Sequence, residues 1–498
     1  MPLSPLRLRL LVSSLLAVSF LGALDNTVVS TAIATVAGQL GALEQMAWIV
    51  VGYTLASTVL LPVLGKLGDR IGPRAVFLAS VAVFVLTSVA CGFAGGFVWL
   101  IVARVIQGMS SAGLQLMSQT IIAEVTTPRQ RPKYLAIIGA AFPVAILVGP
   151  VLGGVITDYW GWPWVFWINA PVGILALALA IVAVPHIEPG RSGRFDIGGA
   201  VALTIGLVAL VLGATWVGDR SQTVATVCAF AVALAALVVF FVVESRVAEP
   251  LVPLGHFRDR TVAAGTVISA IVGVGLFSIT SYLPTYFQMA YRTSATVSGL
   301  VPIATVFGML VSNLATGWLV SRTGHYRLYP LIGTALGAAG LGAMALLPAG
   351  APLWAPVVAM AVVGLGTGAF MSLIVAVVQS AVPRAETGTI TASVNLVRQV
   401  GATVATALVG GIIGASIVAL LPAGLDPATL TPAIVRAQSV AEQQQVALVY
   451  QSVFVPIFVA LAATYLVGVV ASILLPNSRL SDEPGPLRAA PTETIPAA

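Results

Sequence analysis

The ten residues Gly65–Arg74, GKLGDRIGPR, form a charged turn between two long apolar stretches. A degenerate repeat of this turn lies half a chain later at Gly317–Arg327, GWLVSRTGHYR. It keeps the two glycines and two arginines at nearly matching spacing. The copy has Ser321 where the first turn has Asp69. A repeat of this length indicates a duplicated helical bundle.

The composition identifies the solvent of this bundle. Hydrophobic residues make up 58% of the chain and charged residues 8%, and the mean hydropathy is +1.03. A soluble domain carries about 25% charged residues, so this chain cannot cover its surface with charge and must lie in lipid. Duplicated membrane bundles are the plan on which many secondary transporters are built.

Segments of about twenty predominantly apolar residues are needed to cross the hydrocarbon core. The sequence contains fourteen, at 9–31, 44–64, 75–95, 97–120, 134–157, 164–185, 198–217, 222–243, 261–289, 297–320, 328–347, 353–379, 389–420 and 448–475. The fold class predicted is therefore an all-α integral membrane protein with fourteen spans.

The basic residues predict the orientation of these spans. Most of the 23 Lys and Arg fall in alternate connections, such as 65–74, 129–133 and 191–194. Basic residues concentrate in cytoplasmic loops, so both termini are expected in the cytoplasm and the protein in the cell (inner) membrane. The net charge of +6 then reflects topology, and no nucleic-acid partner is expected.

The repeat also organises the chain into bundles. It maps the first five spans onto the ninth to thirteenth, and the sixth reaches the fourteenth after a long outer segment. We expect an N-terminal six-helix bundle at 1–185, two additional spans in a linker at 186–260, and a C-terminal six-helix bundle at 261–476. The C-terminal bundle has a long outer loop at 421–447, where 431–446 is a possible amphipathic helix, and a disordered cytoplasmic tail follows at 477–498.

Asp25 is the strongest functional candidate, because it is the one acidic residue well inside an expected span. An ionisable group in hydrocarbon is costly unless it is paired or faces a cavity, so it indicates function. Arg104 is its expected partner: the two residues lie about six and seven residues from the outer ends of their spans, at similar depth for a rise of about 1.5 Å per residue. The pair either couples proton movement to transport or only holds two helices together.

Arg398 forms a second polar group with Asn395 and Gln399, and no acid inside the second bundle offers Arg398 a partner. Arg398 either faces a central cavity, or binds backbone carbonyl groups, or extends to the membrane surface. The residues expected to line a substrate cavity are Gln115, Gln119, Tyr282, Tyr286, Gln288, Asn313, Gln379, Asn395 and Arg398.

The sequence lacks the residue patterns that ATP binding, serine-based catalysis and zinc binding require. The sequence has no GxxxxGK[ST] pattern for ATP and no serine nucleophile elbow. The three histidines lie in expected loops, without zinc-site spacing. We therefore expect neither an enzyme nor a resident cofactor or metal, and a proton gradient in place of ATP as the driving force.

The motifs together resemble the major facilitator superfamily, and specifically its fourteen-span drug:proton antiporters of the EmrB/QacA type. The resemblance covers nearly the whole chain. It is carried by Leu24–Ile33 in span one, Gly65–Arg74 after span two, Arg104–Gly108 in span four, Gly149–Gly154 in span five, Gly161–Gly173 around span six and Arg398–Gly401 in span thirteen.

The resemblance implies roles for further residues. It implies that Asp25 and Arg104 couple protons. It implies a cytoplasmic gate in which Asp69 meets a helix N-terminus and the arginines pair with Glu124 or with carbonyl groups; the gate residues are Gly65, Asp69, Arg70, Gly72, Arg74 and Glu124. It also implies an antiporter motif that packs span five tightly, formed by Gly149, Pro150, Gly153 and Gly154.

This sequence departs from the usual pattern of that group at two points. Pro163 stands where the group usually has arginine, and the second bundle has no acid inside its spans. The missing acid favours monovalent cationic, neutral or lipid-like cargo over divalent cations. The expected function is export of amphipathic compounds by alternating access; the alternatives are an exporter of lipids or cell-envelope precursors, and a non-transporting scaffold or sensor. A nutrient importer is disfavoured by the motif in span five.

Overall fold

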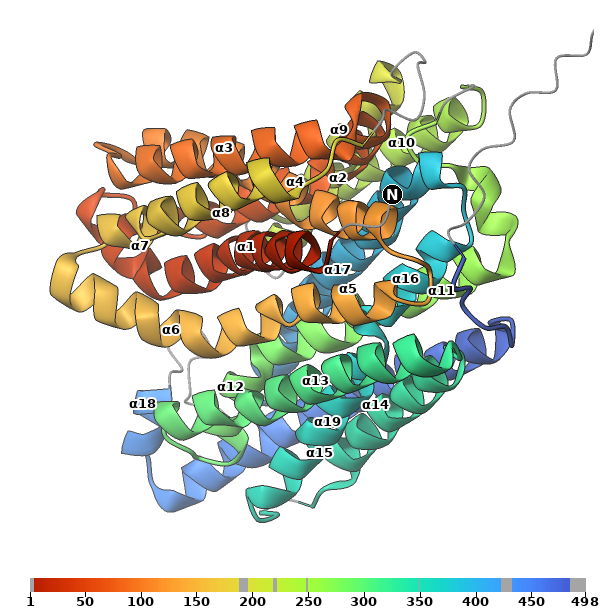
Figure 1. The fold of residues 1–498 in the computed structure, drawn as a ribbon. Coiled ribbons are helices and arrows are strands. Elements are labelled where there is room, and N and C mark those ends of the chain that lie inside the picture. The colour runs from red at the N-terminus through yellow and green to blue at the C-terminus, as the bar shows by residue number, and fades with distance from the viewer. Residues whose placement is uncertain are drawn as a thin grey trace, which may run out of the picture.

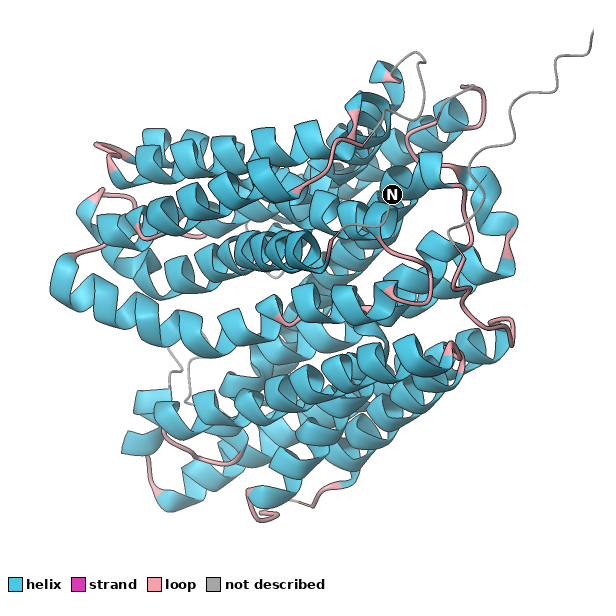
Figure 2. Cartoon of the chain, viewed as in Figure 1, coloured by secondary structure: helices cyan, strands magenta, loops and turns pink. Residues whose placement is uncertain are grey.

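The computed structural model describes residues 4–187, 196–217, 222–247, 250–348, 350–421 and 432–483. Over these residues the chain is helical, and 14 helical segments are long and apolar enough to cross a membrane (Figure 2). The fourteen spans predicted from the sequence are thereby confirmed.

Six spans come from the first 183 residues of the chain. Their helices are α1 Pro5–Gln39, α2 Trp48–Ile71, α3 Pro73–Gly92, α4 Phe97–Val125, α5 Arg131–Gly139 with α6 Ala141–Trp160, and α7 Pro163–Trp167 with α8 Asn169–Ala183.

Proline explains where two of these spans are divided. Pro143 cannot donate to the carbonyl four residues earlier, and α5 ends at that residue, Gly139. Pro171 stands in the same relation to Trp167, where α7 ends. The charged turn Gly65–Arg74 is also set by local residues: Gly72 has φ 95° between α2 and α3, and Pro73 begins α3.

The remaining helices supply the other eight spans. They are α9 Ile197–Trp216, α10 Thr223–Glu244, α11 Arg260–Ile271 continuing through the π-helix η4 Val272–Phe277 into α12 Ser278–Ala290, α13 Ala295–Thr323, α14 Leu328–Leu346, α15 Trp354–Met371 with α16 Leu373–Ser380, α17 Thr387–Leu420 and α19 Val440–Leu474. Short helices connect them: η1 Leu43–Gln45, η3 Leu254–Arg258, η5 Arg384–Glu386 and α18 Pro432–Ala437.

The helices pack as two groups that touch along a shared seam (Figure 1). In the first group α1 packs on α6 and α8, and α4 on α2 and α3. In the second group α13 and α14 pack on α15, and α19 packs on α14. The groups meet where α2 contacts α17 and where α5 contacts α13. The hairpin α9–α10 lies against α2 and α17.

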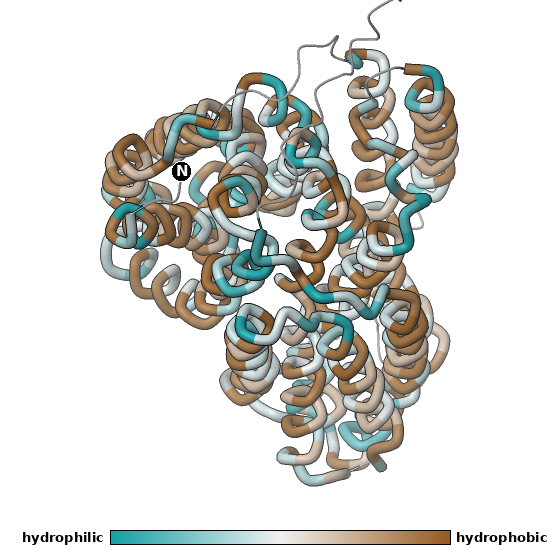
Figure 3. Tube along the Cα trace, turned by 45° about the vertical axis from the view of Figure 1, so that its right-hand side comes forward, coloured by the Kyte–Doolittle hydropathy of each residue, from teal (hydrophilic) through white to brown (hydrophobic). Residues whose placement is uncertain are grey.

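Apolar residues cover the outer surface of this assembly (Figure 3). Large exposed side chains include Leu86, Val151, Leu234 and Val470, on four different helices. In water these side chains would be unfavourable, whereas lipid solvates them, as expected for spanning helices.

Two expectations for the C-terminal part need correction. The outer segment does not form one separate amphipathic helix: residues 422–431 lie outside the described part, α18 is short, and Val440–Ala447 already belongs to α19. The start of the expected tail is ordered, because Leu480 is buried and its N–H donates to the Gly324 carbonyl at 2.9 Å. Residues 484–498 lie outside the described part.

Candidate functional site

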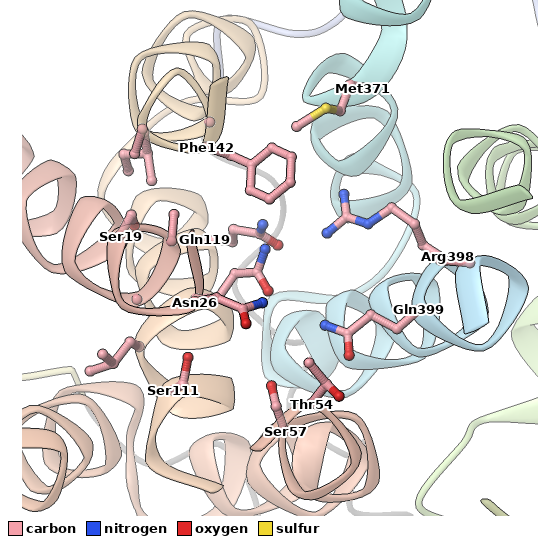
Figure 4. Close-up of a pocket in the computed structure, with 18 of the residues that line it drawn as sticks. Ser19, Asn26, Thr54, Ser57, Ser111, Gln119, Phe142, Met371, Arg398 and Gln399 are labelled. Carbon is pink, nitrogen blue, oxygen red and sulfur yellow. The ribbon is translucent and has the colours of Figure 1, made fainter. Parts of the chain in front are cut away.

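A cavity of about 520 Å³ lies between the two helix groups (Figure 4). Its walls come from α1, α2 and α4 on one side, from α5 and α6 on the second, and from η4, α15, α16 and α17 on the third. This volume is in the range of sites that hold drug-sized molecules. The cavity lies along the seam where alternating access would place a transport site.

The cavity wall has a polar and an apolar part. Phe142 and Met371 lie together at one end, and hydroxyl groups of Thr54, Ser57 and Ser111 lie at the other (Figure 4). Leu135, Ile138 and Val375 extend the apolar part. A wall divided in this way fits an amphipathic molecule.

Arg398 is the charged residue of this wall. Its guanidinium points into the cavity and its Nη2 donates to Asn395 Oδ1 at 2.8 Å (Figure 4). Among the residues that the structure describes, no carboxylate pairs with it. Of the alternatives predicted for Arg398, the structure has the one in which its side chain faces the cavity.

Asp25 and Arg104 form an ion pair outside this wall. Arg104 Nη1 donates to Asp25 Oδ2 at 2.6 Å, and both side chains are 0% exposed. Arg104 Nε also donates to the Ile49 carbonyl at 3.2 Å. The pair predicted from depth along the helices is therefore present, and it is closed off from the cavity.

Neutral side chains complete the surroundings of Asp25. Its Oδ1 accepts from Asn169 Nδ2 at 2.8 Å and from Gln107 Nε2 at 3.1 Å. Both of these amides also donate to Ser88 Oγ. Such a connected network is what a buried charge requires to be tolerated.

Tyr53 links the ion pair to the cavity. Its ring lies under Arg104, with 4.2 Å between the guanidinium carbon and the ring centroid. Its hydroxyl donates to Ser111 Oγ at 2.6 Å, and both residues line the cavity. A change in the position of this ring would reach both Arg104 and a bound molecule.

The last turn of α2, which contains Asp69, closes the seam against the first turn of α17, which contains Gly388. We call this end of the molecule the gate face; the start of α1 lies at the same end (Figure 1). Asp69 accepts from the N–H groups of Gly388 and Thr389, at 2.9 and 2.8 Å, and from Thr389 Oγ1 at 2.6 Å. These donors form the first turn of α17, where the helix dipole also favours a negative charge. The carboxylate therefore joins the two helix groups.

Two glycines allow this approach of α2 to α17. A Cβ on Gly65 would lie 2.6 Å from that of Ala392, and a Cβ on Gly388 would lie 2.5 Å from Asp69 Oδ1. Either side chain would push the helices apart at the gate face.

The other charged gate residues differ in how they match the predicted contacts. Arg74 Nη2 donates to the Ile181 carbonyl at 2.9 Å, near the end of α8, and Arg70 is exposed. Glu124 interacts instead with the charges of Arg131 and Arg384. Of the two alternatives predicted for these arginines, the contact with a helix-end carbonyl is present for Arg74, and within the described residues neither arginine pairs with Glu124.

The glycines of span five pack α6 against α1. A Cβ on Gly149 would lie 2.1 Å from Thr27 Oγ1, and one on Gly153 would lie 2.2 Å from Thr31 Oγ1. Gly154 has no such neighbour within 4 Å, and Pro150 lies inside the helix.

Six residues expected in the cavity wall lie elsewhere. Tyr286 is buried among Phe287, Tyr291, Phe454 and Phe458. Polar contacts between helices engage most of the others: Asn313 donates to the Ala136 carbonyl, Gln379 to the Gln119 carbonyl, Tyr282 to the Thr406 carbonyl and Asn395 to Gln119 Oε1, while Gln288 is half-buried in α12. Gln115, Gln119 and Arg398 do line the cavity.

Much of the polar wall was not predicted from the sequence, namely Ser19, Asn26, Ser30, Thr54, Ser57, Thr58, Ser111 and Thr403. No role was predicted for Ser88, Gln107 and Asn169 around Asp25. Four of these eleven had a sequence signal, because they belong to the quoted motifs: Asn26, Ser30, Gln107 and Asn169.

Comparison with known proteins decides the family. A profile of the Major Facilitator Superfamily matches residues 15–406. The chain belongs to the major facilitator superfamily. As a member of that superfamily it is a multi-pass membrane transporter and not an enzyme.

Individual superfamily members agree with this assignment. An uncharacterised MFS-type transporter of Mycobacterium tuberculosis is 31% identical over 96% of this chain and 71% of its own length. The multidrug transporter protein MdtP of Bacillus subtilis is 31% identical over 82% of this chain and 75% of its own. The crystal structure of the human organic anion transporter MFSD10 shares the fold, with a TM-score of 0.63, 13% identity, and coverage of 94% of this chain and 100% of that one.

Proposed function

We propose that this transporter exports amphipathic compounds in exchange for protons. The observation that carries the proposal is the Asp25–Arg104 ion pair, buried inside spanning helices and joined to the cavity through Tyr53. A buried ion pair in spanning helices is costly to maintain and indicates function. The likeness to MdtP supports a drug-sized cargo.

In the proposed cycle the protein is closed in alternation at the gate face and at the opposite face. In the structure Asp69 holds α2 to α17 at the gate face, and the Asp25 carboxylate is bound by Arg104. Protonation of Asp25 removes its charge and frees Arg104 to move with the ring of Tyr53. That movement changes the cavity wall at Tyr53 and Ser111, so that proton and cargo bind in alternation.

The proposal also assigns the orientation and the driving force. The gate face, with both chain ends, lies in the cytoplasm of a cell whose inner membrane holds the protein, and the proton gradient drives transport without ATP or a resident cofactor. The cavity takes cargo from the cytoplasm or the inner leaflet and releases it at the opposite face.

The test is dye movement driven by a pH gradient in proteoliposomes. Purified protein is compared with Asp25→Asn and Arg104→Ala, using the neutral dye Nile red, the cation ethidium and the anion fluorescein. Gradient-dependent movement of at least one dye by wild type, lost in Asp25→Asn, is expected. Movement that persists undiminished in Asp25→Asn would overturn the role of Asp25.

A further inference from the structure

The charge of the cavity wall points to a cargo class different from the one that the sequence suggested. We propose that the cavity binds amphipathic anions, with the negative group held by Arg398 and Gln119 and the apolar body against Phe142 and Met371. This proposal rests on the proposed transport function and names the substrate class of the same cavity.

The wall carries a positive charge without a negative one. Arg398 points into the cavity, and none of the residues that line it is Asp or Glu. Asp25 directly precedes the lining residue Asn26, but the Asp25 side chain is 0% exposed and is already paired with Arg104. A cation that is 8% exposed is costly unless a counter-charge is supplied, and a bound anion supplies it.

A hydrogen-bond relay leaves a second donor available at the cavity wall. Arg398 can only donate, so the amide oxygen of Asn395 must face it, as the 2.8 Å contact shows. The Asn395 amide nitrogen therefore faces the other way and donates to Gln119 Oε1 at 2.8 Å. The Gln119 amide oxygen is then engaged by Asn395, and its amide N–H groups remain as donors.

Arg398 and Gln119 thus present N–H groups to the same space from opposite helix groups. Both line the cavity, on α17 and α4, and they lie near each other in Figure 4. Hydrogen bonds from a guanidinium to an anionic oxygen are among the strong ones. A carboxylate, sulfonate or phosphate would accept from both residues, whereas a cationic group would be repelled by the Arg398 charge.

The apolar end of the cavity accommodates the rest of such a molecule. Phe142 from α6 and Met371 from α15 lie on the same side of Arg398 in Figure 4. Leu135, Ile138 and Val375 continue this surface. An aromatic or aliphatic body next to a single negative group fits this division of the wall.

The experiment measures binding of two dyes that share a xanthene ring, anionic fluorescein and a cationic rhodamine ester. Binding to purified full-length protein is followed by fluorescence polarisation at equal pH without a gradient. Wild type is expected to bind fluorescein more tightly. Arg398→Gln is expected to weaken fluorescein binding by about tenfold to a hundredfold, the loss of one or two charge-assisted contacts, and to leave the rhodamine ester unaffected. Arg398→Lys retains the charge and is expected to lose only a few-fold.

Gln119→Glu is expected to shift the dye preference from the anion toward the cation, and Arg322→Gln is the control that should leave both affinities unchanged. Gln119→Glu places a carboxylate beside Arg398, so fluorescein binding should fall and rhodamine ester binding should rise. Arg322 lies over Trp318 on the surface of α13, and its replacement should change neither. Equal affinity of wild type for both dyes, no fluorescein binding, or equal weakening of both dyes by Arg398→Gln would overturn the proposal.

A comparison of two bilayers identifies the source of the anion. The absence of a gradient keeps the test of anion binding distinct from the test of proton coupling. Lower fluorescein binding in phosphatidylglycerol bilayers than in phosphatidylcholine bilayers would identify a lipid headgroup as a competing source for the same site. Equal binding in both bilayers would identify soluble amphiphiles. Because these measurements use no gradient, a failure of proton coupling leaves them intact, and a failure of anion preference leaves proton coupling to be judged by transport.

Discussion

Replacing Asp69 by asparagine should open the gate face. The Asp69 carboxylate accepts three hydrogen bonds from the first turn of α17, at 2.9, 2.8 and 2.6 Å. Asparagine keeps one amide oxygen but loses the charge and presents N–H groups to the remaining donors. Hydrogen bonds to charged groups contribute about 1.5–3 kcal/mol each, and the helix dipole adds about 0.3–1 kcal/mol. We therefore expect a net loss of about 3 kcal/mol in the closed state, which shifts the equilibrium about a hundredfold toward opening.

The assay is the distance between spin labels across the gate face. Labels on Ile71→Cys and Ala381→Cys lie at exposed positions at the ends of α2 and α16. The background carries Cys228→Ser, because Cys228 is exposed and would be labelled, whereas Cys91 is buried. Double electron–electron resonance should show a longer distance population in Asp69→Asn than in the parent.

The repeat supplies a matched control for this measurement. Ser321 occupies the position in the second turn that corresponds to Asp69, and its hydroxyl donates to the Trp318 carbonyl of its own helix at 2.7 Å. Ser321→Ala should leave the distance distribution unchanged. An unchanged distribution in Asp69→Asn, or an equal shift in Ser321→Ala, would refute the reasoning.

Three further changes have predicted outcomes. Asp25→Asn leaves the Arg104 charge buried without its partner and should lower the free energy of unfolding by about 3–5 kcal/mol, read as a lower Tm; an unchanged Tm would contradict the ion pair. Gly153→Ala should destabilise by about 1–3 kcal/mol, because its Cβ would meet Thr31 at 2.2 Å, whereas Gly154→Ala, with open space around it, should leave Tm unchanged. Tyr53→Phe keeps the ring under Arg104 but loses its 2.6 Å hydrogen bond to Ser111, so stability should fall by about 1 kcal/mol; a loss as large as that of Asp25→Asn would contradict this division of roles.

Length and depth along helices could be predicted from the sequence. The apolar runs gave the spans, because lipid demands about twenty apolar residues for each crossing. Depth brought Asp25 and Arg104 together, because each helix advances about 1.5 Å per residue from a membrane surface. The resemblance implied that Asp69 contacts a helix N-terminus, and its carboxylate does accept hydrogen bonds from the start of α17.

The direction of each side chain around its helix could not be predicted. Asp25 is sealed beside Arg104, whereas the next residue, Asn26, lines the cavity, because successive residues of a helix point about 100° apart. For the same reason Tyr286, expected in the cavity, lies in an aromatic cluster instead. The relay from Arg398 through Asn395 to Gln119 crosses between helix groups, and no spacing within one segment predicts it.

The most direct test of proton exchange runs the coupling in reverse. Proteoliposomes containing trapped pyranine, without a pH gradient, receive an outward gradient of whichever dye wild type transports. Wild type should move protons inward as the dye leaves, and Asp25→Asn should bind the dye without moving protons. Dye efflux by wild type with no change in internal pH, or equal proton movement in Asp25→Asn, would contradict coupling through Asp25.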